Sequence, residues 1–314
     1  MRGALIGALV GDALGSPFAG QAGPVAEGAI GSLESVAARR AFTHDTAMTV
    51  GVAESLLFHG GVDQDHLART LVVRNERRPD RGHGRVTASL LRRIGSGEDW
   101  RHAATSQLGG RGSAGSSAAA RVTSLGLWAS DVHEAARLGH ASAEVTHAHP
   151  VAVDAAGVQA AAIHLAAWER TAGPLAAEHF VSELTRVAST KNLAESVELA
   201  LQLSSASPPR VAEAIGNGSA ALEAVPAALC GFLHHPDSYR DAVRFVVRLG
   251  GNAGTIATMT GAIAGARLGE AAVPIHWRAY TEGVDEVQQL ADRVVTRMLN
   301  PTAPFPDERF RPPR

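Results

Sequence analysis

Cysteine is nearly absent from this sequence. Cys230 is the single cysteine among 314 residues, so no intrachain disulfide can form, and a reducing cytoplasm is the expected compartment. Cys230 lies in the apolar run from Ala227 to Phe232. That setting favours a small buried side chain over a reactive nucleophile.

Aromatic residues and an excess of charge of either sign are also scarce. Aromatic residues make up 4% of the chain and the formal net charge is −2. A nearly neutral chain has no broad basic surface, so we expect no binding to nucleic-acid duplexes. Several arginines lie between Arg74 and Arg85 without interleaved aromatic residues, and we predict a solvated loop there.

Long uninterrupted apolar runs are missing as well. The apolar segment from Gly3 to Val10 is short, is followed by Asp12, and has no small-residue cleavage site after it. We therefore predict a buried first helix instead of a signal peptide. No stretch of membrane-spanning length is free of charged and polar breaks, so we expect no membrane insertion.

What the sequence does contain is helical periodicity. Hydrophobic residues make up 45% of the chain, alanine is abundant, and the alternation typical of strands is hard to find. With no linker interrupting it, residues 1–314 are predicted to form one all-α domain, an orthogonal helical bundle. We expect a monomer, because such a fold buries its own core. The helices are predicted at 45–58, 62–74, 86–94, 118–128, 132–142, 148–170, 175–187, 193–204, 220–233, 239–249, 252–268 and 284–299.

Five short motifs occur in order along nearly the whole chain. They are Gly3–Gly15, which ends in Gly-Asp-Ala-Leu-Gly; Thr43–Thr49, which begins with Thr-His-Asp-Thr; the pair Arg81–Gly84 and Gly115–Leu127; Thr146–Pro150, which reads Thr-His-Ala-His-Pro; and Leu249–Thr255, which reads Leu-Gly-Gly-Asn-Ala-Gly-Thr. Each motif alone is weak, but their order resembles that of the ADP-ribosylglycohydrolase family. The resemblance implies that family's all-helical fold and the hydrolysis of a ribosyl glycosidic bond.

The resemblance also implies a metal site, and here the sequence departs from the pattern. Family members hold two magnesium ions between their Thr-Asp-Asp and Asp-x-Asp-Thr segments, and magnesium prefers carboxylate oxygens. His44, Asn252 and Gly254 stand at three of these ligand positions. Two divalent ions about 4 Å apart would repel by roughly 16 kcal/mol at an effective dielectric constant of 20, which one carboxylate cannot offset. A two-magnesium site is therefore not expected.

A single divalent ion, Mg, Mn or Zn, remains open as a cofactor. Its ligands would be Thr43, Asp45 and Thr255, and His44 would favour zinc, manganese or iron. The leading expectation is no metal.

Two functions stay open. In the first, Asp45 acts as general base or electrostatic partner in the hydrolysis of an ADP-ribosylated protein or a related nucleotide or nucleoside, helped by His44 or His147. In the second, the pocket binds ADP-ribose without turnover. In both, the expected substrate contacts are Thr43, His83, Gly84, Gly115, Ser116, Ser117, Ala118, Asn252 and Thr255.

These residues also have purely structural interpretations. Thr43 and Asp45 could simply cap the helix that follows them. Loop histidines such as His147 more often satisfy backbone groups than catalyse. Asp12 is predicted to cap or brace the turn at the end of the first motif.

Overall fold

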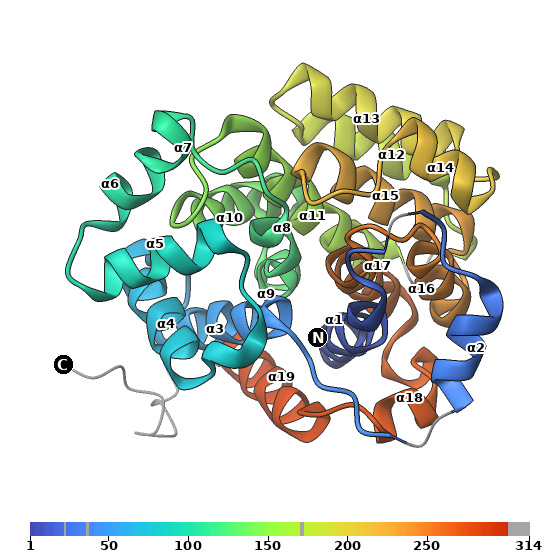
Figure 1. The fold of residues 1–314 in the computed structure, drawn as a ribbon, viewed down its shortest axis with the longest axis horizontal. Helices are drawn as coiled ribbons and strands as arrows, with labels where there is room; N and C mark the ends of the chain where they lie inside the picture. Colours follow the sequence, from blue (N-terminus) through green and yellow to red (C-terminus); the bar gives the residue numbers. More distant parts are fainter. Residues whose placement is uncertain (22, 36–37, 170–172, 301–314) are drawn as a thin grey trace.

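The computed structural model describes residues 1–21, 23–35, 38–169 and 173–300, and these fold as a packed assembly of helices (Figure 1). Within those ranges no residue lies in a named strand, and the only extended pairings are two isolated bridges, Arg40 with Thr281 and Gly115 with Ala220. The prediction of an all-α fold is confirmed. The elements are α1 (Arg2–Gly15), η1 (Ser16–Phe18), α2 (Glu27–Ser35), α3 (His44–His59), α4 (Gln64–Arg77), η2 (Pro79–Arg81), α5 (Arg85–Gly95), α6 (Trp100–Thr105), α7 (Gln107–Gly110), α8 (Ser117–Ala120), α9 (Thr123–Trp128), α10 (Val132–Glu144), α11 (Pro150–Glu169), α12 (Ala177–Val187), α13 (Lys191–Gln202), α14 (Pro208–Ala214), α15 (Ala221–His234), α16 (Tyr239–Val247), α17 (Ala253–Leu268), η3 (Glu270–Ala272), α18 (Ile275–Ala279) and α19 (Val284–Leu299).

Most long helices lie where the apolar periodicity predicts them, within about two residues at either end. Asp63 caps α4 as expected, since its side chain accepts a hydrogen bond from the backbone N–H of His66. One predicted helix was wrong in detail: residues 118–128 form two short helices, α8 and α9, separated at Arg121 and Val122. The end of the helix predicted at 148–170 falls on Arg170, which lies outside the described residues.

The prediction of a solvated loop at 74–85 was also wrong in part. Helix α4 continues to Arg77, and the side chain of Arg81 is buried. Arg81 pairs with Glu282 at 2.7 Å and stacks on the Phe42 ring, with its guanidinium carbon 3.7 Å from the ring centroid. A buried ion pair with a residue two hundred positions away cannot be seen in local composition.

Helices α1 and α17 lie side by side near the centre of the molecule (Figure 1). Their facing residues run in opposite order along the chain, so the two helices are antiparallel. A Cβ atom added at Gly3, Gly7, Gly11 or Gly15 would lie 2.2 to 2.7 Å from the backbone oxygen of Gly265, Gly261, Ala257 or Ala253, respectively. One glycine in every turn thus lets the two backbones touch along the full length of α1. This packing places the beginning of α17 beside the end of α1.

Helix α11 passes through the core beside α10 and α17. Its segment Pro150–Trp168 is long and apolar enough by composition to cross a membrane, yet 72% of it is buried inside the protein. Asp154, Gln159 and His164 interrupt it. Burial against other helices accounts for the apolar character without a membrane.

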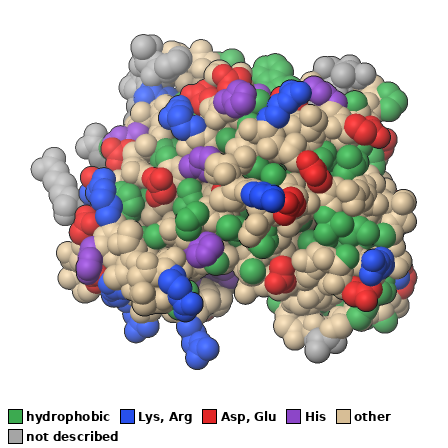
Figure 2. Space-filling model, turned by 90° about the horizontal axis from the view of Figure 1, so that it is seen from above, with side chains coloured by type: hydrophobic (Ala, Val, Ile, Leu, Met, Phe, Trp, Pro, Cys, Tyr) green, Lys and Arg blue, Asp and Glu red, His purple; other side chains and the backbone are tan. Residues whose placement is uncertain are grey.

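The surface agrees with the nearly neutral composition. On most of the face shown in Figure 2, acidic and basic side chains are interspersed, and several basic side chains gather toward its lower left edge.

Candidate functional site

The beginning of α3 is held by a buried carboxylate from α1. Asp12 is fully buried and accepts four hydrogen bonds: from the backbone N–H and hydroxyl of Thr43, at 2.9 and 2.7 Å, and from those of Thr46, at 3.2 and 2.6 Å. Thr43 is also the N-cap of α3, since its hydroxyl oxygen accepts from the N–H of Asp45. The sequence predicted that Asp12 would cap or brace the turn at the end of the first motif. In the structure it instead braces the first turn of α3.

The beginning of α17 is held by backbone contacts. Gly250 and Gly251 both have positive φ, 70° and 59°. The N–H of Gly251 donates to the carbonyl of Gln21 at 3.0 Å, and the N–H of Asn252 donates to the carbonyl of Asn217 at 2.7 Å. These contacts leave the side chains of Asn252 and Thr255 free to face the other helix.

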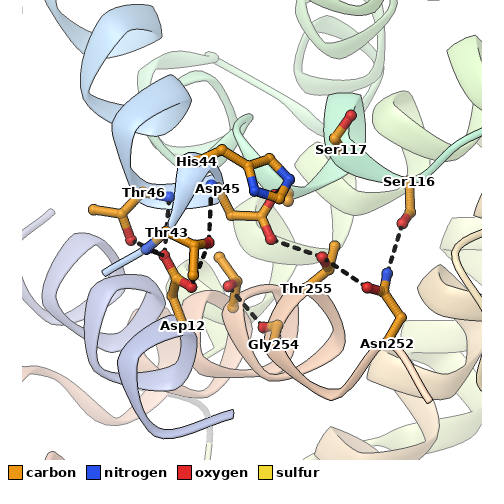
Figure 3. A network of polar contacts seen from close by, with 12 residues as sticks. Asp12, Thr43, His44, Asp45, Thr46, Ser116, Ser117, Asn252, Gly254 and Thr255 are labelled. Atoms are coloured by element: carbon orange, nitrogen blue, oxygen red, sulfur yellow. Dashed lines mark hydrogen bonds and ion pairs between the residues drawn. The ribbon is translucent and has the colours of Figure 1, made fainter. Parts of the chain in front are cut away.

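Side chains from the two helix starts meet in one polar chain (Figure 3). The Thr255 hydroxyl donates to Oδ2 of Asp45 at 2.7 Å and lies 3.3 Å from Oδ1 of Asn252. The side-chain amide of Asn252 in turn donates to the Ser116 hydroxyl at 3.3 Å. Three motifs separated by up to 210 residues therefore converge on Asp45, whose side chain is 1% exposed.

His44 contacts Asp45, and His83 packs against His44. Nε2 of His44 is 3.2 Å from Oδ1 of Asp45, and the His44 ring packs against the His83 ring with centroids 5.1 Å apart. Nδ1 of each ring is buried and has no hydrogen-bond partner among the described residues. Buried ring nitrogens without partners are uncommon in folded proteins, and they mark this as a place where a ligand or water could bind.

His147 lies beside the Gly115–Ala118 segment. Its Nε2 atom is 3.4 Å from the Ser117 hydroxyl, and a Cβ atom on Gly115 would lie 3.6 Å from the same nitrogen. Ser116 and Ala118 are buried at the start of α8. Gly84 is exposed at the start of α5. Of the predicted substrate contacts, it is the one for which no contact with the other site residues is found among the described residues.

Burial shifts the pKa values of several side chains here. It raises the pKa of Asp12 to about 6, with a further contribution from the nearby charge of Asp45. Burial lowers the pKa of His147 to about 3, aided by the positive charge of Arg121. Burial, together with His44, lowers the pKa of His83 to about 4. At neutral pH, His147 and His83 are therefore uncharged and Asp12 is largely ionised.

The oxygen atoms around Asp45 are few for hard cations. Asp12 is the other nearby carboxylate, and both of its oxygens already accept hydrogen bonds from Thr43 and Thr46. The Thr43 hydroxyl is bonded to Asp12 and to the N–H of Asp45. The described residues include no group of three or more His, Cys, Asp or Glu side chains arranged to hold a metal. One free carboxylate and neutral oxygens do not fit a pair of magnesium ions, which need several anionic oxygens.

A separate cavity of about 560 Å³ lies beyond His147. His140, Glu144, Asp154, Trp100 and Arg101 are among its lining residues, whereas Asp45, Asn252 and Thr255 are not. It is therefore distinct from the polar chain around Asp45, although His147 borders both.

Two residues that organise the site were not among those predicted. Arg121 is completely buried behind His147, and Asn217 holds the glycine loop before α17 through its carbonyl and through a 2.6 Å hydrogen bond from its side chain to the carbonyl of Leu249. Arg121 belongs to a predicted segment, but an arginine at a helix end is ordinarily expected at the surface. Asn217 stands between two glycines, a turn signal that does not reveal its distant partners.

Comparisons with known proteins agree with this architecture. The ADP-ribosylglycohydrolase family model matches residues 1–303. ADP-ribosylhydrolase ARH3 of Gallus gallus is 32% identical over 93% of this chain and 91% of its own length, and that of Homo sapiens is 32% identical over 92% and 91%. A solved structure described as an ADP-ribosylglycohydrolase-related protein complex superposes with a TM-score of 0.70 over 95% of this chain and 96% of its own, at 23% identity.

An all-helical hydrolase fold is thus the class that the structure and its relatives define. The chain belongs to the ADP-ribosylglycohydrolase family.

Proposed function

We propose that this protein hydrolyses the glycosidic bond that joins ADP-ribose to a protein or a related nucleotide, and that it does so without a two-magnesium centre. The observation that carries the proposal is the 2.7 Å contact between Asp45 and Thr255. It brings the two motifs that flank the family's reaction centre to one point, while the side chains between them are mostly uncharged. The ARH3 relatives, named as ADP-ribosylhydrolases, support the bond type.

Asp45 is the centre of the proposed mechanism. Cleavage of a ribosyl bond builds positive charge on the sugar ring, and an ionised carboxylate stabilises such charge or accepts a proton from the attacking water. Thr255 and His44 each contact one oxygen of Asp45, at 2.7 and 3.2 Å, so the carboxylate is held in one orientation. Preorganisation of this kind lowers the barrier because little rearrangement is needed as charge develops.

The surrounding residues are proposed to bind the substrate. Ser116, Ser117 and His147 present two hydroxyls and a ring nitrogen beside a close backbone turn at Gly115. Asn252 donates to the Ser116 hydroxyl, and His83 packs against His44. Polar, uncharged donors of this kind suit ribose hydroxyls and phosphate oxygens.

A single divalent ion remains compatible with this proposal. Asp45 and Thr255 would hold it through side-chain oxygens, and Thr43 would join them only by giving up its hydrogen bond to Asp12. The ion would polarise the water or the ribose oxygens. Without an ion, Asp45 and His44 would carry out the hydrolysis by themselves.

The second candidate function is binding of ADP-ribose without turnover. The replacement of three acidic positions by His44, Asn252 and Gly254 favours it, because the relatives' metal chemistry would then be lost while the walls of the pocket persist. Hydrolysis and binding are separated by one experiment.

That experiment is a turnover assay on ADP-ribosyl-serine, ADP-ribosyl-arginine and a nucleoside analogue, with chelator or with added Mg²⁺, Mn²⁺ or Zn²⁺. We expect release of ADP-ribose by the wild type with chelator present, and a loss of at least a hundredfold in Asp45→Asn. Glu195→Gln is the matched control, since Glu195 is exposed on α13 and its ion pair among the described residues is with Lys191, which is also exposed. Saturable ADP-ribose binding by calorimetry without release would leave the second candidate, and absence of both would reject the proposal.

A gain-of-function variant tests the proposed ligand positions. In the triple variant His44→Asp, Asn252→Asp, Gly254→Asp, the added carboxylates should raise the affinity for Mg²⁺ well above that of the wild type. A Cβ atom at position 254 would lie 3.3 Å from Cα of Ser16, so a small shift of η1 must accompany it. Failure of the folded triple variant to bind Mg²⁺ would show that these three positions do not correspond to metal ligands.

A further inference from the structure

Arg121 is a fully buried cation whose hydrogen bonds go to the end of α10 and to the loop that follows it. Its side chain is 0% exposed, and no acidic side chain among the described residues pairs with it. Instead, Nη1 donates to the Thr146 hydroxyl at 2.9 Å, Nη2 to the Ser142 carbonyl, and Nε to the Ser142 hydroxyl at 3.4 Å. Burying a charge among neutral acceptors is costly, so its position calls for an explanation.

The hydrogen bonds of Thr146 can be assigned by counting protons. A guanidinium group only donates, so the Thr146 oxygen must accept from Arg121. The hydroxyl proton then has two acceptors in reach: Nδ1 of His147 at 2.7 Å and the Ala143 carbonyl at 3.5 Å. The Ala143 carbonyl already accepts the N–H groups of Thr146 and His147, at 3.0 and 2.9 Å. Both of its lone pairs are in use, so the hydroxyl proton goes to Nδ1.

We infer that Arg121 and Thr146 are positioning residues that fix His147 as the tautomer with its proton on Nε2, and so make it a hydrogen-bond donor to substrate. Because Nδ1 accepts from Thr146, a neutral imidazole must carry its single proton on Nε2. That nitrogen points to Ser117 and Gly115. His147 thus donates to an oxygen of the ligand and does not take a proton from water.

The charge of Arg121 has a second effect. Burial lowers the pKa of Arg121 to about 9, so it remains positive at neutral pH, and its charge helps to keep His147 neutral. A neutral donor of fixed orientation binds a ribose or phosphate oxygen without a change of protonation. The identity of the ligand rests on the proposed function. The tautomer of His147 does not, because it follows from contacts inside the protein.

Nitrogen-15 NMR of the imidazole in the ligand-free, full-length protein tests the inference directly. The His147 signals are assigned by their loss in His147→Gln. We expect one tautomer with a protonated Nε2 in the wild type and in Thr146→Ser, and a mixture of tautomers in Thr146→Val. A proton on Nδ1 in the wild type would overturn the inference, whether or not the protein hydrolyses anything.

Calorimetry with ADP-ribose tests the consequence for binding. Thr146→Val should weaken affinity by about five- to tenfold, the value of one well-oriented hydrogen bond, while Thr146→Ser stays within about twofold. Arg121→Lys retains the charge but loses the planar set of donors, and it should show the tautomer mixture of Thr146→Val. If Thr146→Val binds like the wild type and keeps a single tautomer, the hydroxyl does not orient His147. If neither the wild type nor any variant binds ADP-ribose, the proposed function is wrong, but the NMR result still identifies the tautomer of His147.

Discussion

The starts of α3 and α17 face each other across the candidate site, and they are held in opposite ways. The start of α3 depends on one buried charge, because Asp12 accepts all four hydrogen bonds from Thr43 and Thr46. The start of α17 has no side-chain cap. It depends on shape, through the two glycines at 250 and 251 and the backbone bond from Asn252 to Asn217.

The difference explains which side chains remain available for chemistry. On α3, capping consumes Thr43, and only Asp45 and His44 are left to face the site. At the start of α17, backbone hydrogen bonds fix the position of the helix. The side chains of Asn252 and Thr255 are therefore available to contact each other and Asp45. Electrostatic anchoring on one side and steric fit on the other should therefore respond differently to mutation and to pH.

The largest effect is expected from removal of the charge that anchors α3. Asp12→Ala leaves four donors buried without an acceptor, and we expect a loss of roughly 3–5 kcal/mol in the free energy of unfolding. Chemical denaturation at about pH 8, where the Asp12 carboxyl is ionised, measures it. Asp12→Asn keeps the size and one acceptor oxygen and should lose less. Equal and small losses in both variants would show that the anchor is dispensable.

The second-largest effect is expected at the close contact between α1 and α17. Gly11→Ala places a Cβ atom 2.2 Å from the Ala257 carbonyl oxygen, so α1 and α17 must move apart, at a cost of roughly 3 kcal/mol. The matched control is Gly28→Ala on α2, where nothing lies within 4 Å of the added atom. That control should be neutral or slightly stabilising, because alanine favours a helix. A thermal-unfolding comparison that finds the two variants alike would contradict the close packing of these helices.

A change of pH should alter the stabilisation of the α3 start by Asp12, but not the packing of the α17 start. The pKa of Asp12 is raised to about 6 in the folded protein, above the ordinary value of about 3.9 in the unfolded chain. The folded state therefore binds the proton more tightly, and the stabilising effect of protonation is lost as the pH rises through 6. From about pH 4.5 to about pH 7, the wild type should lose roughly 2 kcal/mol relative to Asp12→Asn. A difference between the two that does not vary with pH would rule out the raised pKa.

Much of this arrangement could be predicted from the sequence. Apolar periodicity located α3 and α19, and the ordered motifs indicated that residues 43–46 and 250–255 would approach each other, as the structure shows for Asp45 and Thr255. Local spacing and motif order carry such information because they reflect helix faces and chain topology.

The remainder depends on contacts between distant residues. The break at Arg121 falls within an apolar run that reads as one helix, and the burial of Arg121 follows from acceptors on α10 that local sequence does not reveal. The partners of Asp12, Thr43 and Thr46, are likewise 31 and 34 residues away in the chain. Hydrogen-bond partners across a fold are set by packing, so propensity alone could not assign them.

The smallest effect on stability is expected where the two helix starts touch. Thr255→Val removes the hydroxyl that donates to Asp45 while keeping the side-chain shape, so unfolding should become easier by about 1 kcal/mol. Function should suffer more than stability, because Asp45 loses one of the two contacts that orient it. Thr255→Ser retains the donor and should restore activity or ADP-ribose binding. If valine and serine have the same effect on function, the contact between Asp45 and Thr255 only joins the helices, and the orientation of the carboxylate must depend on His44.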